Sequence, residues 1–374
     1  FEGKKTFPFK DEEFIRMWIA DMEFAMCPAI IDAVKERLDK RILGYSQVFE
    51  QAFYDAYNTW NEKMYGWTYP RRDICFSLGI IPALYKLTEF LLTDNEYAVV
   101  NTPAYGYFRN ALDYNGKKAV YNKLYKDKEG RWRIDFESLE RDAADPQAKL
   151  LIWCSPHNPT GRIWTEEELK KVAAVVEKYN LWIISDEIHC DLLRQGRKHI
   201  PMAKIMPGYD KLIVCTSASK CFNMAGLMLA EIIIRNRDLK DRWITYTNSY
   251  AMNINPLAIA AHRAAYEHGY EWLDRMKTYL DGNFSFVKET LDRDLPETRF
   301  EIPEATYLAW VDLNPYMGDI EDIPDFFANK AGVLLEGGDA LFVDNAKYVR
   351  LNLAMPRSLL AEGLKRIVAA VKNR

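Results

Sequence analysis

A lysine that could bond covalently to an aldehyde ends one of the most apolar runs of the chain. Residues 212–219 read Leu-Ile-Val-Cys-Thr-Ser-Ala-Ser, and Lys220 follows directly. Because burial penalises a charged ammonium, a lysine carried inside by such a strand shifts towards the neutral, nucleophilic amine. A Schiff base with an aldehyde requires that neutral amine. Taken alone, the pattern fits a solvated lysine at the start of a loop equally well, and that situation is commoner.

Groups that suit the same chemistry follow three other apolar runs in the middle of the chain: Asn158 after residues 149–154, Asp186 and His189 after 181–185, and Tyr105 after 96–100. Ligands collect at the carboxyl ends of parallel strands, so these side chains and Lys220 are expected to meet in one crevice. An amine, a carboxylate, an amide and an aromatic ring are the groups that a pyridine aldehyde cofactor requires.

A phosphate site is predicted at the start of a helix near residue 80. Residues 77–82 read Ser-Leu-Gly-Ile-Ile-Pro and precede a helical pattern over 83–92. Gly79 lets the backbone approach an anion closely, and Pro82 suits a first helical turn, where free N–H groups point at the anion. The sequence contains neither a Walker A loop nor a Rossmann glycine fingerprint, which disfavours a nucleotide ligand.

Length and composition narrow the class of protein. A chain of 374 residues is too long to fold around one simple core. Its length predicts two domains, or one large α/β unit with an appendage. The net charge of −4 gives no reason to expect nucleic acid or an anionic membrane as a partner. No apolar stretch approaches the length of a membrane span. Six scattered cysteines, several of them within apolar runs, favour a reducing compartment and hence the cytoplasm.

The order of the predicted elements indicates a sheet covered by helices. Short apolar runs alternate with helical patterns such as 103–112 and 165–179, and the second pattern begins with the capping box Thr165–Glu168. This alternation is typical of an α/β fold with three layers and a mostly parallel sheet. Residues 230–234 follow Lys220 closely enough to form an antiparallel neighbour of its strand.

A second unit is predicted towards the C-terminus. From about residue 257 long helical patterns continue to 295, and two alternating strands follow at 306–311 and 348–353. A last helix is expected from residue 359 to the C-terminus. These elements predict a smaller α+β domain, which the N-terminal segment joins.

Taken together, the motifs resemble the fold-type I pyridoxal-phosphate enzymes of aminotransferase class I/II, and most closely their MalY/PatB-like branch of cystathionine β-lyases, or C–S lyases. The matching segments occur in family order across nearly the whole chain: residues 18–24, 44–45, 79–84, 103–105, 158–161, 186–189, 217–223, 305–310 and 348–353. The resemblance implies an aspartate-aminotransferase-like large domain over residues 35–260, and a small domain built from residues 1–34 and 261–374.

The resemblance also implies a pyridoxal 5′-phosphate cofactor and a role for each matching residue. Lys220 would bind the cofactor aldehyde and later move the α-proton of the substrate. Asp186 would pair with the pyridine nitrogen. His189 and Asn158 would lie near the phenolate oxygen, and Tyr105 would stack on the ring.

Further groups would bind the phosphate and the substrate. The phosphate would contact the hydroxyl of Ser217 and the backbone amides of Gly79, Ile80 and Ile81. Arg350 would bind the substrate carboxylate in a bidentate pair, and Asp21 would also contact the substrate. Tyr45 would take part in substrate binding and catalysis from a neighbouring subunit, which implies a homodimer with shared active sites.

Two positions depart from the family pattern. Many relatives carry a basic residue eight positions after the lysine to bind the phosphate, where this chain has Met228. Residues 336–343, ahead of Arg350, match the family loosely, so the pocket for the substrate side chain is not defined by the resemblance.

The expected reaction is β-elimination from a sulfur-containing amino acid, such as cystathionine or a cysteine S-conjugate, to give a thiol, pyruvate and ammonia. An aminotransferase is the first alternative, because it shares every step up to removal of the α-proton and uses the same Lys220. A non-catalytic regulatory or binding protein on the same fold is the second alternative. Lys220, Asp186 and Arg350 together argue against it, since a binding protein has no need of all three.

A zinc site is a competing interpretation of four residues near adjacent strand ends: Cys154, His157, His189 and Cys190. Neighbouring residues on a strand point to opposite faces, so His189 and Cys190 do not readily share an ion. The sequence therefore predicts a site without a metal.

Overall fold

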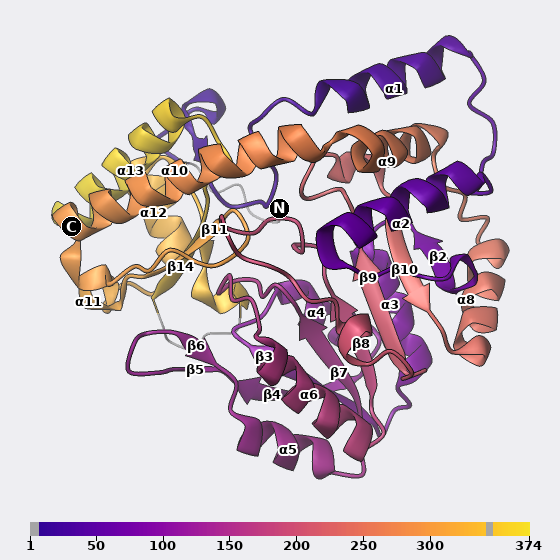
Figure 1. The fold of residues 1–374 in the computed structure, drawn as a ribbon. Helices are drawn as coiled ribbons and strands as arrows, with labels where there is room; N and C mark the ends of the chain where they lie inside the picture. The colour runs from indigo at the N-terminus through magenta and orange to yellow at the C-terminus, as the bar shows by residue number, and fades with distance from the viewer. Residues whose placement is uncertain (1–6, 342–346) are drawn as a thin grey trace.

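The computed structural model describes residues 7–341 and 347–374, and a seven-stranded sheet forms its centre (Figure 1). In spatial order its strands are β2 (Ile74–Ser77), β10 (Ala230–Ile234), β9 (Leu212–Thr216), β8 (Trp182–Asp186), β7 (Ala148–Cys154), β3 (Tyr97–Thr102) and β4 (Lys118–Lys123). Strands β9, β8, β7, β3 and β4 run parallel, whereas β10 runs antiparallel to both β9 and β2. The mostly parallel sheet and the antiparallel strand at 230–234 are confirmed.

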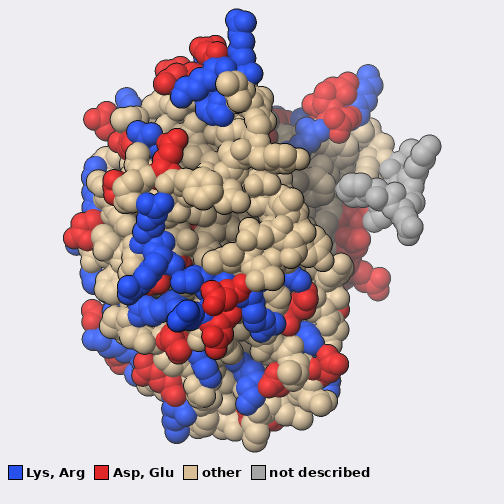
Figure 2. All heavy atoms as spheres, turned by 90° about the vertical axis from the view of Figure 1, so that its right-hand side faces the viewer, with Lys and Arg blue, Asp and Glu red and all other residues tan. Residues whose placement is uncertain are grey.

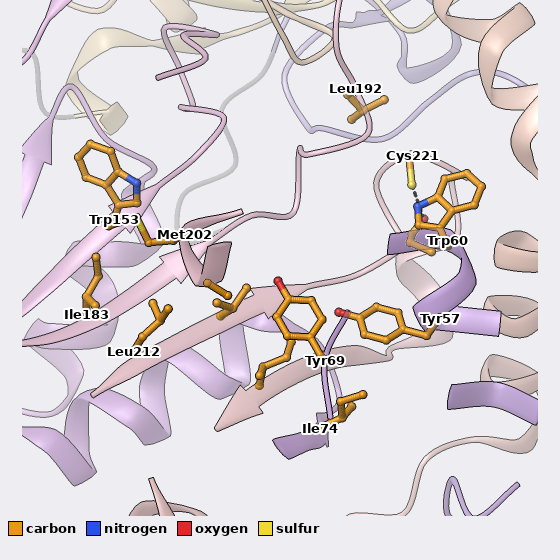
Figure 3. Close-up of a cluster of buried hydrophobic side chains, with 14 of the residues drawn as sticks. Tyr57, Trp60, Tyr69, Ile74, Trp153, Ile183, Leu192, Met202, Leu212 and Cys221 are labelled. Carbon is orange, nitrogen blue, oxygen red and sulfur yellow. Dashed lines mark hydrogen bonds between the residues drawn. The ribbon is translucent and has the colours of Figure 1, made fainter. Parts of the chain in front are cut away.

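Helices cover both faces of this sheet and make the predicted three layers. One face packs against α2 (Gln51–Tyr65), α5 (Phe136–Ala144), α6 (Glu166–Lys178), α7 (Met202–Ile205) and α9 (Pro256–His268). The opposite face packs against α3 (Ile80–Leu91), α4 (Gly106–Tyr114) and α8 (Arg237–Ser249). Successive strand residues enter different cores: Ile183 joins the first cluster, and Ile184 the second. Figure 3 shows part of the first cluster, including Trp153, Ile183 and Leu212.

The predicted helix boundaries are close to the observed ones, with one correction. The capping box is present, because Thr165 Oγ1 accepts from Glu168 N and a Glu168 carboxylate oxygen accepts from Thr165 N. The helix expected from residue 103 begins only at Gly106. Residue Tyr105 is extended, and the N–H of Ala104 donates to the carbonyl of Leu341 instead of entering a helical turn.

A separate antiparallel sheet of three strands has the order β11 (Leu308–Asp312), β14 (Tyr348–Asn352) and β13 (Glu336–Gly337). It packs with α10 (Tyr270–Asp294), α12 (Ile323–Ala331) and α13 (Arg357–Lys372), which Figure 1 shows to the left of the large sheet. The short strand β1 (Ile15–Arg16) pairs with β12 (Val333–Leu334), so the N-terminal segment joins this smaller α+β unit. The domain boundaries at 34/35 and 260/261 stay a prediction.

The remaining elements are short or peripheral. They are α1 (Pro28–Asp39), α11 (Asn314–Met317), the paired strands β5 (Tyr125–Lys126) and β6 (Trp132–Arg133), and the 3₁₀ helices η1 (Asp11–Glu13), η2 (Arg71–Asp73), η3 (Ala225–Leu227), η4 (Pro296–Thr298) and η5 (Gly338–Leu341). All six cysteines are buried and free in the described structure. No helix within residues 7–341 and 347–374 has both the length and the apolar character needed to cross a membrane.

We expect Thr165→Ala to lower the free energy of unfolding by about 1 kcal/mol, because the variant removes the acceptor for an N–H at the start of α6. Thr165→Ser keeps that acceptor and serves as the control, with most of the stability retained. Urea unfolding followed by circular dichroism measures both variants. Equal losses for alanine and serine would show that the cap does not stabilise the helix.

Candidate active site

Lys220 lies in the loop that follows β9, and its amine contacts the N-terminal segment. Its Nζ donates to the carbonyl oxygen of Ala20 at 2.7 Å and lies 3.9 Å from Oδ1 of Asp21. The hydroxyl of Tyr307 donates to the same carbonyl at 2.7 Å. Burial lowers the pKa of Lys220, nearby Asp21 opposes this shift, and Arg350 adds to it. The lysine is therefore an ordered amine shifted towards its nucleophilic form, and not a solvated loop residue.

Asp186 lies at the carboxyl end of β8, in the middle of the sheet. It is buried, and in register it is flanked by Cys154 of β7 and Cys215 of β9. Its Oδ1 accepts from the N–H of Ile188 at 3.2 Å. Burial raises the pKa of Asp186 to about 7, while this N–H lowers it. A carboxylate held in this state gains free energy from any cationic N–H group that reaches it.

His189 follows Asp186 on the same connection and is a neutral imidazole. Burial lowers its pKa to about 3, and the positive charges of Lys220 and Arg350 contribute to the shift. The ring meets the edge of Tyr307 at a centroid distance of 6.3 Å. Its Nδ1 is buried and has no hydrogen-bond partner among the described residues. This nitrogen is available to a ligand atom in the crevice.

Arg350 enters the crevice from β14 of the smaller sheet. Its Nη1 donates to Oδ1 of Asn158 at 3.1 Å, and its Nη2 donates to the carbonyl of Trp18 at 3.1 Å. Its Nη2 also forms an ion pair with the carboxylate of Glu336. Burial lowers the pKa of Arg350, and the charge of Glu336 opposes this. Its Nε has no hydrogen-bond partner within the described part of the chain.

Two asparagines fasten the N-terminal segment across the crevice. The amide of Asn223 accepts from the N–H of Met22 at 3.1 Å and donates to the carbonyls of Met22 and Phe24, each at 2.9 Å. Asn352 Nδ2 donates to the carbonyl of Ile19 at 2.8 Å. Residues 18–24 are therefore held from the lysine loop on one side and from β14 on the other. We call residues 18–24 the N-terminal strap.

The predicted phosphate site has free backbone donors. Gly79 precedes α3 with φ of +123°, a conformation that side chains rarely adopt, and no described side chain caps this helix. The hydroxyl of Ser77 is buried and without a partner among the described atoms. Ser217, in contrast, already donates to the carbonyl of Leu229 at 2.7 Å and accepts from the N–H of Ser219 at 3.1 Å. The amides of Gly79, Ile80 and Ile81 are thus better placed for an anion than the hydroxyl of Ser217.

The remaining predicted residues differ in position. Tyr105 is half-buried at the start of α4, and burial raises the pKa of its hydroxyl while the nearby charge of Arg350 opposes this shift. Tyr45 is 95% exposed and lies outside the crevice of its own chain. Met228 is half-exposed, and its thioether carries no charge, so it does not replace the missing phosphate-binding cation.

The unpartnered polar atoms fit pyridoxal 5′-phosphate. Lys220 offers an amine for the aldehyde, and the buried carboxylate of Asp186 suits a protonated ring nitrogen. The buried Nδ1 of His189 and the uncapped start of α3 are available for a phenolate and a phosphate. The described residues contain no group of three or more potential metal ligands. The individual roles of the site residues stay predictions.

Sequence reasoning missed four side chains that organise this crevice: Tyr307, Asn223, Asn352 and Glu336. The first three lie within the motif segments, and the two asparagines interrupt otherwise apolar or loop-forming stretches. Their position within the motif segments could have identified these three residues as part of the site. Glu336 carried no such signal, because it belongs to the segment that matches the family loosely.

The chain belongs to the aminotransferase class I and II family, which matches residues 12–367. It is 35% identical to cystathionine β-lyase PatB of Bacillus subtilis strain 168, over 95% of this chain and 92% of that protein. It is 32% identical to MalY of Escherichia coli strain K12, over 97% and 93% of the two chains. A solved structure, the PLP-bound C–S lyase from Staphylococcus hominis, has a TM-score of 0.93 at 42% identity, covering 96% and 92%. The resemblance inferred from the motifs is confirmed.

We expect Asp186→Asn to stabilise the cofactor-free protein at alkaline pH. The folded-state pKa of about 7 lies above the unfolded value of about 3.9. Between these values the unfolded chain loses its proton first, so stability falls as the pH rises through this window. The variant lacks this loss. Its free energy of unfolding should match wild type near the lower pKa and exceed it above the higher one by a few kcal/mol, at about 1.4 kcal/mol per pKa unit, with a correspondingly higher melting temperature.

Thermal unfolding of the cofactor-free proteins across this pH range measures the difference. The exposed Asp55→Asn variant is the control and should follow wild type at every pH. A constant gap between Asp186→Asn and wild type at all pH values would contradict the shifted pKa.

Proposed function

We propose that this protein is a pyridoxal 5′-phosphate-dependent carbon–sulfur β-lyase, which cleaves cystathionine or another cysteine S-conjugate to a thiol, pyruvate and ammonia. The observation that carries the proposal is the site in which Lys220, from the loop after β9, meets Asp186 of β8 and Arg350 of β14. Relatives similar over nearly the whole chain are named cystathionine β-lyase and C–S lyase, which supports this reaction.

The bound cofactor supplies an electron sink for the charge that develops at the substrate α-carbon. The protein residues supply the proton transfer and the orientation. Lys220 has a lowered pKa and is the base that takes the α-proton at its Nζ. Arg350 orients the substrate by its carboxylate, and the carbonyl of Ala20 fixes the lysine in the crevice.

An apolar surface around Tyr45 supports the proposed homodimer. Ile42, Leu43, Tyr45, Phe49 and Tyr250 are all more than half exposed. Figure 2 shows the side of the molecule that carries α1, α2 and α8, where a broad uncharged area lies above a group of basic side chains. Large apolar side chains that are exposed, as these five are, mark protein interfaces where they gather. In the dimer, Tyr45 extends into the crevice of its partner. Location in the cytoplasm stays a prediction.

An aminotransferase is the rival that shares most of the chemistry, because removal of the α-proton by Lys220 serves both reactions. The products separate them. We expect the wild-type protein to release pyruvate and a thiol from L-cystathionine without any oxo-acid. Lys220→Ala should reduce kcat by at least about 10³-fold, the usual scale for loss of a catalytic base. The surface variant Lys211→Ala is the control and should retain turnover. Strict dependence on an added oxo-acid would assign the aminotransferase reaction instead.

Shared active sites predict complementation between two inactive variants. Tyr45→Ala and Lys220→Ala should each be strongly impaired as homodimers. A hybrid dimer contains one site with both residues intact, so unfolding and refolding an equal mixture should restore roughly a quarter of wild-type activity. The exposed Tyr114→Ala is the control for Tyr45 and should itself be active. No recovery in the mixture would show that Tyr45 does not act across subunits.

A further inference from the structure

The guanidinium of Arg350 already has a carboxylate partner from its own chain. In the three-stranded sheet, Arg350 of β14 is directly opposite Glu336 of β13 and Trp310 of β11. Residues in register share a face of a sheet, so Glu336 lies beside the guanidinium and forms the ion pair with Nη2. The neutral acceptors Asn158 and Trp18 hold the two terminal nitrogens as well.

The two members of this pair differ in their access to solvent. The side chain of Arg350 is 3% exposed, whereas that of Glu336 is 28% exposed. Burial raises the pKa of Glu336 and the charge of Arg350 lowers it, so the carboxylate is retained in the crevice mainly by the arginine. Glu336 also lies on an edge strand, which pairs with β14 through two residues. The glutamate side chain is therefore partly exposed to solvent, whereas the arginine side chain is almost completely buried.

We propose that Glu336 competes with the substrate carboxylate for Arg350, so that ligand binding exchanges one carboxylate for another. The identity of the substrate rests on the proposed function, but the exchange requires only a ligand with a carboxylate. Two carboxylates beside one buried guanidinium leave an uncompensated negative charge, which is costly in a poorly solvated site. The incoming carboxylate therefore displaces Glu336 towards solvent.

This exchange makes Glu336 a specificity-determining residue. An uncharged ligand interacts more weakly with the guanidinium of Arg350 than the carboxylate of Glu336 does. It therefore leaves the Glu336–Arg350 ion pair in place. A carboxylate ligand replaces the pair and gains Arg350 as its partner. Glu336 thus weakens the binding of a carboxylate ligand, which must displace it, and it has less effect on an uncharged ligand, which does not.

The variant Glu336→Gln tests the exchange, because it keeps the shape and removes the charge. The probe is sodium propionate, titrated into the pyridoxal-phosphate-loaded protein at constant ionic strength, with propionamide as the uncharged probe of the same shape. Ligand-dependent melting temperatures give the dissociation constants. We expect the variant to bind propionate about tenfold more tightly, which corresponds to about 1.4 kcal/mol. We also expect KM for L-cystathionine to fall by a similar factor, with most of the change in KM and little in kcat.

A matched control separates competition from a merely structural ion pair. Asp281 pairs with Arg194 at 2.9 Å, and the exposures of the two side chains are 27% and 10%, close to those of the Glu336–Arg350 pair. Asp281→Asn should lose stability without ligand while leaving propionate affinity and KM unchanged. Glu336→Asp keeps the charge on a shorter side chain and should bind propionate with intermediate affinity. It replaces Glu336→Gln as the test should the glutamine variant fail to fold.

The outcomes distinguish this inference from the proposed function. Tighter propionate binding by Glu336→Gln supports the exchange, even in a protein without lyase turnover, in which case the proposed function alone fails. Lyase turnover together with unchanged or weaker propionate binding in Glu336→Gln overturns the exchange and leaves the proposed function intact. An equal gain for propionate and propionamide would also overturn it, because it would show that the variant only opens space.

Discussion

The crevice depends on keeping three ionisable groups out of water while each still has a partner. Burial lowers the pKa of Lys220 and Arg350 and raises that of Asp186, so all three are displaced towards their neutral forms. Their partners inside the protein include backbone dipoles, namely the Ala20 carbonyl, the Ile188 N–H and the Trp18 carbonyl, beside the partly exposed acids Asp21 and Glu336. Dipoles stabilise a charge less than a counter-ion does. A ligand of opposite charge can therefore stabilise each of these groups further, which is what a reactive site requires.

The N-terminal strap is the element that makes this arrangement possible. Its carbonyls at Trp18 and Ala20 accept from Arg350 of the three-stranded sheet and from Lys220 in the loop that follows β9. The amides of Asn223 and Asn352 fix the strap from both sides. One short segment with several bends thus contacts both the lysine and the arginine. Since these hydrogen bonds hold a segment that is largely exposed, loss of either asparagine affects the contacts of both cations.

The sequence predicts the parts of the site that depend on strand order. Asp186, Asn158, Tyr105 and Lys220 follow apolar runs, and parallel pairing brings the ends of those runs to one edge. The position of Glu336 depends instead on the register between β13 and β14, two strands joined by a loosely matching segment, and no local pattern encodes it. The start of α4 was predicted too early for a similar reason, because Ala104 bonds to the distant Leu341. The position of Tyr45 relative to a second subunit depends on how two chains pack together, which no pattern within one chain encodes.

Each buried cation of the crevice also has an acid that is more exposed than itself. Asp21, 61% exposed, lies beside Lys220, which is 22% exposed, and Glu336 stands in the same relation to Arg350. Such pairs offset the positive charge of the site without holding the acid in place, because the acid is partly exposed while the cation is more buried. A ligand that brings its own negative charge then restores neutrality from within. The two acids therefore stabilise the folded protein in the absence of the ligand and lower its affinity for the ligand.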